Sequence, residues 1–189
     1  MRIVAGDHRG RSLVAPKGHS TRPTADRTRQ ALFNVLEHAS WGRSLVRARV
    51  LDLFAGSGAL GLEALSRGAA FCLFLDRDAA AREAIGANAA ALDLIDRTRI
   101  DRRDATTLGT RTNADGPPFE LAFLDPPYGQ SLGEATLARL PAGGWLAAGA
   151  LAVLERAFGD PAPTPDGFRL LDERTWGAAR VSFLSPLAP

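Results

Sequence analysis

The sequence predicts an α/β protein with a doubly wound, mostly parallel sheet, a C-terminal antiparallel hairpin and a small N-terminal β-hairpin extension. Three observations support this fold class. Short apolar runs alternate with longer segments of helical spacing, as in repeated βαβ units. A glycine-rich turn, residues 56–61, follows the first long apolar run. Apolar runs end abruptly in aspartate, which is typical of parallel strands that deliver polar residues to one edge of a sheet.

The N-terminal part of the chain predicts a hairpin followed by a linker. Residues 2–5 and 11–15 are β-prone, and the polar, basic residues 6–10 between them contain two glycines. Residues 16–23 have no regular pattern. We therefore expect two units, a basic hairpin and linker over residues 1–23 and a main domain over residues 24–189.

The main domain is predicted to open with a helix capped by Thr24, whose hydroxyl can accept a backbone N–H. Trp41-Gly42 ends this helix. Apolar and small residues recur in it at helical spacing and predict its buried face. These residues are Thr28, Leu32, Val35, Leu36 and Ala39.

Strands and helices then alternate along the chain. The predicted strands are residues 50–54, 70–75, 98–100, 119–124 and 150–154. The predicted helices run from the glycine turn to about residue 67, over residues 79–92 and over residues 132–140, with a polar loop at 109–118. Residues 168–176 and 179–184, joined at Gly177, predict the closing antiparallel hairpin.

Composition narrows the class of protein. A chain of 189 residues with 46% hydrophobic residues can build one domain with a sizeable core. No apolar run reaches membrane-spanning length and the N-terminus lacks a signal-peptide pattern, so we expect a cytoplasmic protein with no membrane partner. The single cysteine, Cys72, lies in an apolar run and is expected to be a buried structural thiol.

Positive charge is concentrated at the N-terminus. Residues 1–30 carry seven Lys and Arg against two Asp, whereas the net charge of the whole chain is only +2. This concentration favours a polyanionic partner such as nucleic acid. The alternative is compositional, because the chain uses arginine almost to the exclusion of lysine. The residues predicted to contact RNA are Arg9, Arg11, Lys17, Arg27 and Arg29.

The glycine turn predicts a nucleotide-like cofactor. Gly56, Gly58 and Gly61 match G-x-G-x-x-G, and Asp76 lies 20 residues beyond Gly56, where an acid that binds a ribose is expected. These features alone are compatible with NAD. However, Asp52 ends the strand before the turn, where a carboxylate would crowd a pyrophosphate but would suit a ligand with an ammonium group. S-adenosylmethionine meets this requirement, and the alternative is that the glycines serve only close packing of helix and sheet.

The second motif is Asp125-Pro126-Pro127-Tyr128, for which hydride transfer offers no role. An exocyclic base amine is a poor nucleophile because its lone pair is delocalised into the ring. Asp125 and the Pro126 carbonyl can accept both amine N–H groups, and neither proline brings a competing N–H donor. Tyr128 offers a ring on which an extruded base can stack. We therefore predict that Asp125, Pro126, Pro127 and Tyr128 form the catalytic motif of a methyltransferase that acts on a nucleobase amine.

With these motifs in place, the chain resembles the RsmD-type bacterial 16S ribosomal RNA guanine-N2 methyltransferases over nearly its whole length. The resemblance lies in residues 2–6, 9–11 and 13, in Arg22-Pro23-Thr24 followed by residues 26, 27, 29 and 32–34, in residues 52–69 and in residues 123–128. The glycine turn is shared with many methyltransferases, whereas the N-terminal residues combined with Asp-Pro-Pro-Tyr are far more specific. Asp76 stands where the family often has glutamate, and the final hairpin carries Phe183 where relatives are often rich in tyrosine, so that hairpin is not expected to be catalytic.

The resemblance implies a Rossmann-like class I methyltransferase fold, S-adenosylmethionine as donor and a guanine of 16S ribosomal RNA, within a small-subunit particle, as acceptor. It also suggests that Arg22-Pro23-Thr24 closes over the methionine end of the cofactor. The expected cofactor site comprises Arg22, Thr24, Asp52, Phe54, Ala55, Gly56, Ser57, Gly58, Gly61, Asp76, Arg77, Asp104, Ala105 and Asp125. We expect a monomer.

Other functions remain as alternatives. Asp-Pro-Pro-Tyr also suits adenine-N6 methylation of DNA, although 189 residues leave no room for a target-recognition domain. The related Asn-Pro-Pro-Tyr motif serves glutamine methylation of release factors, which gives the basic N-terminus no purpose. A non-catalytic RNA-binding protein would show decay of one motif, and both are intact. His8, His19 and His38 lack metal-ligand spacing, so we expect no metal.

Overall fold

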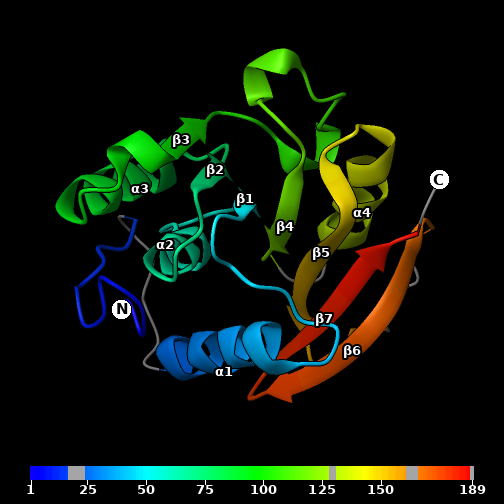
Figure 1. The fold of residues 1–189 in the computed structure, drawn as a ribbon, viewed down its shortest axis with the longest axis horizontal. Coiled ribbons are helices and arrows are strands. Elements are labelled where there is room, and N and C mark those ends of the chain that lie inside the picture. The colour runs from blue at the N-terminus through cyan, green and yellow to red at the C-terminus, as the bar shows by residue number, and fades with distance from the viewer. Residues whose placement is uncertain (17–23, 128–130, 161–165, 188–189) are drawn as a thin grey trace.

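A computed structural model describes residues 1–16, 24–127, 131–160 and 166–187 of the chain. Its centre is a seven-stranded sheet with the strand order β3-β2-β1-β4-β5-β7-β6. In Figure 1 the sheet runs from β3 on the left to β6 at the lower right. The strands are β1 Arg49–Leu53, β2 Phe71–Leu75, β3 Thr98–Asp101, β4 Phe119–Leu124, β5 Leu146–Ala157, β6 Phe168–Trp176 and β7 Ala179–Pro186.

The strand directions confirm the predicted fold class. β1 pairs in parallel with β2 and β4, β2 pairs in parallel with β3, and β4 pairs in parallel with β5. β7 pairs antiparallel with both β5 and β6, so the C-terminal hairpin extends the parallel part of the sheet. Parallel strands need crossover connections, and the helices provide them.

Helices cover both faces of the sheet. They are α1 Thr24–His38, α2 Ala59–Ser66, α3 Ala79–Ala91 and α4 Leu132–Ala142, with short 3₁₀ turns at Ile95–Arg97, Ala105–Thr107 and Asn113–Asp115. Side chains of α1, α2 and α3 share one hydrophobic core with one face of the sheet, and side chains of α4 share a second core with the other face. None of the helices in the described part of the chain is long and apolar enough to cross a membrane.

The N-terminal residues form a hairpin-like loop that is docked on the main domain. A single antiparallel bridge joins Arg2 to Ser12. Glu63 of α2 accepts the N–H groups of Val4 and Ala5 at 2.8 and 3.0 Å. Asn88 of α3 exchanges two hydrogen bonds with the backbone of Val14, at 2.8 and 3.0 Å, and donates a third to Ser57 O in the glycine turn. These hydrogen bonds hold the N-terminal loop, residues 1–16, next to the glycine turn.

Two details differ from the sequence prediction. The strand β5 is predicted over residues 150–154 but spans 12 residues, because it also pairs with β4 at Leu146 and with β7 up to Ala157. Its register against β4 shifts between Phe119 and Leu121, and Gly149 in this part of β5 has a φ of 67°. The buried face of α1 is wider than predicted, since Arg29 and Phe33 are 4% and 0% exposed. Arg29 can be buried because it forms ion pairs with Asp26 and Glu63.

Candidate active site

Asp76, Asp104, Asp125 and the glycine turn lie along the edge of the sheet at which the parallel strands end. Asp104 follows β3, Asp76 directly follows β2, the glycine turn follows β1 and Asp125 directly follows β4. The strand order places them along this edge in the same succession, from Asp104 to Asp125. Glu155 of β5 continues the row, because Leu124 and Leu154 are register partners and are followed by Asp125 and Glu155.

The glycine turn after β1 has a left-handed backbone at Phe54, Gly56 and Gly58, where φ is 59°, 57° and 76°. The N–H of Gly56 donates to Oδ2 of Asp76 at 2.9 Å, and Oδ1 of Asp76 accepts the N–H of Asp78 at 2.9 Å. Asp76 therefore fixes both the turn and the approach to α3. Each of its oxygens keeps a further lone pair with which to bind a ligand.

Gly61 and Asp52 support the turn from inside the fold. A Cβ on Gly61 would lie 2.4 Å from Cε1 of Phe74 and 2.5 Å from Sγ of Cys72, so a side chain does not fit there. The Gly61 N–H donates to Oδ2 of Asp52 at 2.9 Å. Asp52 is only 2% exposed, and this loss of hydration raises its pKa to about 8 against the opposing effect of the Gly61 hydrogen bond.

A cavity of about 680 Å³ extends along the sheet edge from β3 to β4. This volume is in the range of small-molecule binding sites. Met1, Ala15 and Pro16 of the N-terminal loop form part of its wall. Of the residues that the sequence predicted for a cofactor, the following line this first cavity: Phe54, Gly56, Ser57, Asp76, Arg77, Asp104, Ala105 and Asp125.

Asp104 presents a charged acceptor to the first cavity. Its Oδ1 accepts the hydroxyl and the backbone N–H of Thr106 at 2.6 and 2.9 Å. These hydrogen bonds, with a smaller effect from Arg77, lower the pKa of Asp104. Its Oδ2 lies 3.9 Å from Nη1 of Arg77, whose side chain is 73% exposed. Asp104 is therefore ionised at neutral pH and can accept a hydrogen bond from a ligand amine.

A second cavity, of about 330 Å³, adjoins the first and shares part of its lining. Both contain Met1, Phe54, Gly56, Ser57 and Asp125. The second cavity also reaches the predicted residues Asp52 and Ala55. Beyond them it extends to α1, β5 and the β6–β7 hairpin, where it is lined by Thr28, Arg29, Leu32, Glu155, Trp176, Ala178 and Ala179.

Asp125 is the acidic residue after β4 that borders both cavities. The residue is accessible from the cavities, and protein atoms crowd its carboxyl group. Loss of hydration, followed by the nearby carboxylates of Glu155 and Asp52, raises the pKa of Asp125 well above its usual value. The first cavity is also lined by Pro126 and Pro127, which have no N–H groups. Tyr128 lies outside the described residues.

Gly58 and Gly61, which the sequence predicted for the cofactor, line neither cavity. Gly58 and Gly61 are buried beneath the turn, and Thr24 is the first residue of α1. Arg22 and Lys17 lie outside the described residues.

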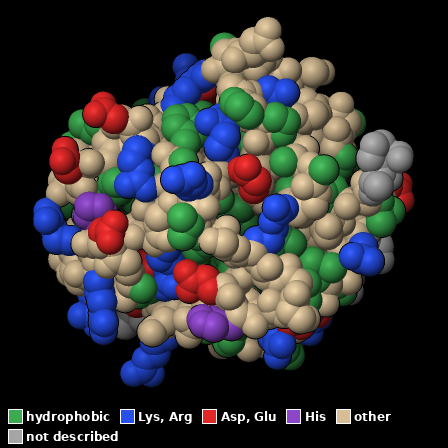
Figure 2. Space-filling view, in the orientation of Figure 1, with side chains coloured by type: hydrophobic (Ala, Val, Ile, Leu, Met, Phe, Trp, Pro, Cys, Tyr) green, Lys and Arg blue, Asp and Glu red, His purple; other side chains and the backbone are tan. Residues whose placement is uncertain are grey.

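The predicted RNA-binding residues have different surroundings. Arg9, Arg11 and Arg27 are exposed, and Arg11 donates to the Ala91 carbonyl at 2.6 Å. Arg29 is only 4% exposed and pairs with Asp26 at 2.8 Å, so most of its side chain is enclosed by the fold, and it contributes to the lining of the second cavity. Figure 2 shows Lys and Arg side chains scattered over one face among Asp and Glu side chains, so basic residues are not confined to the N-terminal loop.

Sequence reasoning missed several residues that line the cavities. Met1, Pro16 and Arg103 enter the wall of the first cavity, and Glu155 and Trp176 enter that of the second. A signal for Glu155 was available, because the apolar run of residues 150–154 ends in a carboxylate as the run before Asp125 does. No comparable pattern marks the others.

Comparison with known proteins identifies a family and several relatives of this chain. The family described as conserved hypothetical protein 95 matches residues 1–185. Ribosomal RNA small subunit methyltransferase D of Escherichia coli K12 is 38% identical over 178 residues, which cover 94% of this chain and 85% of that protein. The protein of the same name from Haemophilus influenzae is 34% identical, covering 94% and 89%. A solved structure from Escherichia coli, described as the methyltransferase yhhF, superimposes with a TM-score of 0.83 at 34% identity and covers 100% of this chain and 99% of its own.

Proposed function

The chain belongs to the conserved hypothetical protein 95 family, which contains the RsmD-type ribosomal RNA methyltransferases, and we propose that it methylates the exocyclic N2 amine of a guanine in bacterial 16S ribosomal RNA. The donor is S-adenosylmethionine. The acceptor is a guanine presented within a small-subunit particle, and the enzyme acts as a cytoplasmic monomer. The methyltransferase fold and the names of the relatives support transfer to ribosomal RNA, and the choice of guanine N2 follows the family resemblance.

The residues of the first cavity suit S-adenosylmethionine. Asp76 has lone pairs for the two ribose hydroxyls, and Asp104 has an oxygen for the adenine amine. The glycine turn lets the backbone approach a ligand closely. Asp52 borders the second cavity next to Gly56, where a carboxylate suits the ammonium group of the methionine end. When bound there, the cofactor supplies an activated methyl group on its sulfonium.

The chemistry asked of the protein is positioning of the acceptor amine. The carboxylate of Asp125 accepts one amine N–H and the Pro126 carbonyl accepts the other, which localises the nitrogen lone pair. The raised pKa of Asp125 also suits the removal of a proton from the methylated nitrogen, because a more basic carboxylate binds that proton better. Tyr128 is proposed to stack on the base.

The observation that carries this proposal is the position of Asp125 at the junction of the two cavities. A transfer enzyme must bring donor and acceptor to one point, and this carboxylate borders both spaces. The exposed arginines of the N-terminal loop and of the face in Figure 2 would contact the phosphates of the RNA.

The test is transfer of a labelled methyl group from S-adenosylmethionine to total RNA, to DNA and to partly assembled small subunits from a strain that lacks this enzyme. Hydrolysis to nucleosides then identifies the product. We expect label in N2-methylguanosine from the 16S RNA. Label in N6-methyladenosine, in DNA or in protein would contradict the proposed acceptor and would favour the corresponding alternative.

A further inference from the structure

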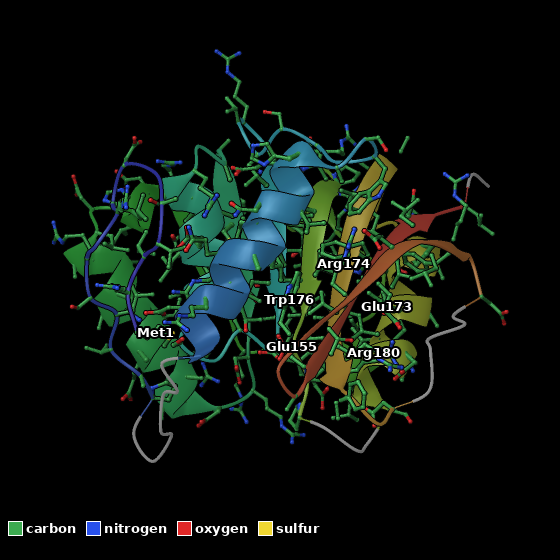
Figure 3. The ribbon with its side chains drawn as sticks, turned by 90° about the horizontal axis from the view of Figure 1, so that it is seen from below. Met1, Glu155, Glu173, Arg174, Trp176 and Arg180 are labelled. Atoms are coloured by element: carbon green, nitrogen blue, oxygen red, sulfur yellow. The ribbon has the colours of Figure 1, made fainter. Side chains whose placement is uncertain are left out.

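One half of the second cavity has no role in the function proposed so far. It is formed by Glu155 at the end of β5 and by Trp176, Ala178 and Ala179 at the turn of the β6–β7 hairpin. Figure 3 shows Glu155 and Trp176 close together beside α1, at the end of the hairpin. A carboxylate and an indole ring thus flank the same space, which is open to Asp125.

The strand order divides the site into two halves. The carboxylates at the ends of β3 and β2, Asp104 and Asp76, line only the first cavity. The residues of β5 and the hairpin line only the second, and Asp125 of the intervening β4 edge borders both. If the donor occupies the half from β3 to β1, the base whose amine meets Asp125 has to lie on the β5 side. This step rests on the proposed function.

Glu155 is placed to meet the same base as Asp125. The two residues follow the register partners Leu154 and Leu124 on adjacent parallel strands, whose spacing is about 4.8 Å. Residues that continue such a register point to the same face of the sheet. Both side chains line the second cavity, and Glu155 is half-buried, so a hydrogen bond to it is shielded from bulk water.

Glu173 on β6 provides an instructive contrast. Its Oε2 accepts from Nη2 of Arg156 at 2.6 Å and from the hydroxyl of Ser182 at 2.9 Å, and its Oε1 lies 3.6 Å from Nε of Arg180. It lines neither cavity. Figure 3 shows Glu173 and Arg180 displaced from Glu155 along the hairpin. Glu173 therefore has a structural role within the sheet, whereas Glu155 faces the space next to Asp125.

We propose that Glu155 accepts a hydrogen bond from the N1–H of the target guanine, while Trp176 forms an apolar wall of the pocket that holds the base. In guanine the N1–H lies next to the N2 amine on the same edge of the ring. A carboxylate accepts but does not donate, so it suits guanine and disfavours a base with an acceptor at position 1, such as adenine. Glu155 is thus the residue that selects guanine, and Asp125 is the residue that holds the reacting amine.

The test uses 2-aminopurine at the target position of reconstituted small subunits. This base keeps the 2-amine but has an unprotonated N1 and no O6. Wild-type enzyme is expected to prefer guanine over 2-aminopurine by about 100-fold or more in kcat/KM, because a site built for an N–H rejects an analogue that lacks it. Glu155→Gln can donate its amide to N1 of 2-aminopurine, so this preference should fall at least about 10-fold.

Controls separate the possible failures. Glu83→Gln changes an exposed glutamate of α3 that lines neither cavity and should leave the preference unchanged. Glu155→Gln should bind S-adenosylmethionine within about twofold of wild type, which shows that the donor half is intact. The same preference in wild type and Glu155→Gln would overturn the role of Glu155 while leaving the proposed function in place. Wild-type enzyme that transfers no methyl group to guanine N2 would instead overturn the proposed function.

Discussion

Oδ2 of Asp76 accepts the backbone N–H of Gly56 at 2.9 Å, so the acid at the end of β2 holds the glycine turn that follows β1. The 20-residue separation of these two residues in the sequence is closed by the parallel pairing of β1 and β2, in which Leu53 lies opposite Leu75. The residue that is proposed to bind the ribose therefore also fixes the conformation of the turn that is proposed to approach the cofactor.

We expect Asp76→Ala to weaken binding of S-adenosylmethionine by about 10- to 100-fold, since hydrogen bonds to a charged group contribute roughly 1.5–3 kcal/mol. Asp76→Asn should lose less, because the amide oxygen can still accept the Gly56 N–H. Equilibrium titration with S-adenosylmethionine measures both. Asp96→Ala, at an exposed aspartate after α3, is the matched control. Equal affinity in Asp76→Ala and Asp96→Ala would remove Asp76 from the cofactor site.

Asp52 should make stability depend on pH. Its pKa is raised to about 8 in the folded protein from 3.8, so between pH 4 and pH 8 the folded state binds more protons than the unfolded state. The free energy of unfolding should therefore fall as pH rises through this window. Asp52→Asn keeps an oxygen for the Gly61 N–H and removes the titration. Urea unfolding gives the free energy of unfolding at pH 5 and at pH 8. Between these two pH values it should fall by a few kcal/mol more in the wild type than in Asp52→Asn. Parallel pH profiles for the two proteins would contradict this account of Asp52.

Glu63 should be a main determinant of how the N-terminal loop is held. It is fully buried in α2, accepts the N–H groups of Val4 and Ala5, and pairs with Arg67 at 2.8 Å and Arg29 at 3.5 Å. Glu63→Ala leaves two guanidinium groups without this partner and should lower the free energy of unfolding by about 3–5 kcal/mol. Chemical denaturation measures the loss, with Glu83→Ala as an exposed control. A loss below about 1 kcal/mol would show that the buried pairs contribute little.

Neutralising Arg9 and Arg11 together to Gln should weaken RNA binding and reduce its dependence on salt, because phosphate contacts release counterions. The slope of log affinity against log salt should decrease by about 1 to 2. Filter binding to 16S RNA at several salt concentrations provides the slope. Unchanged affinity at low salt would exclude the N-terminal loop from the RNA interface and leave the other exposed arginines to provide it.

Much of the fold followed from the sequence because the central strands β1, β2 and β4 are almost entirely buried and several turns are marked by glycine. β1, β2, β4 and the hairpin β6–β7 have the predicted residues within one position at most ends. The early part of β5 was not predictable, since residues 146–149 (LAAG) carry no strand pattern and the strand there depends on pairing with β4. The burial of Arg29 likewise depends on Glu63, which lies 34 residues away in the sequence.

The site residues that belong to a sequence motif could be predicted. The residues that only the order of strands in the sheet brings to the site could not. Asp76 and Asp125 end apolar runs, Asp104 follows the weak strand at residues 98–100, and all three line the first cavity. Glu155 and Trp176 belong to no motif, and they reach the second cavity only because β5 and the hairpin lie next to β4 in the sheet. Gly56 and Gly58 were correctly placed in a turn, whereas Gly61 lies within α2, where it packs against Phe74.

Asp125 is proposed to hold the acceptor amine without being needed to bind the donor. This role is tested by measuring methyl transfer and S-adenosylmethionine affinity on the same preparation of Asp125→Ala, with its fold checked by thermal unfolding. We predict that transfer to the small subunit is lost while the affinity for S-adenosylmethionine stays within a few fold of wild type. Transfer at a rate close to that of wild type, or a variant that no longer folds, would contradict the assigned role.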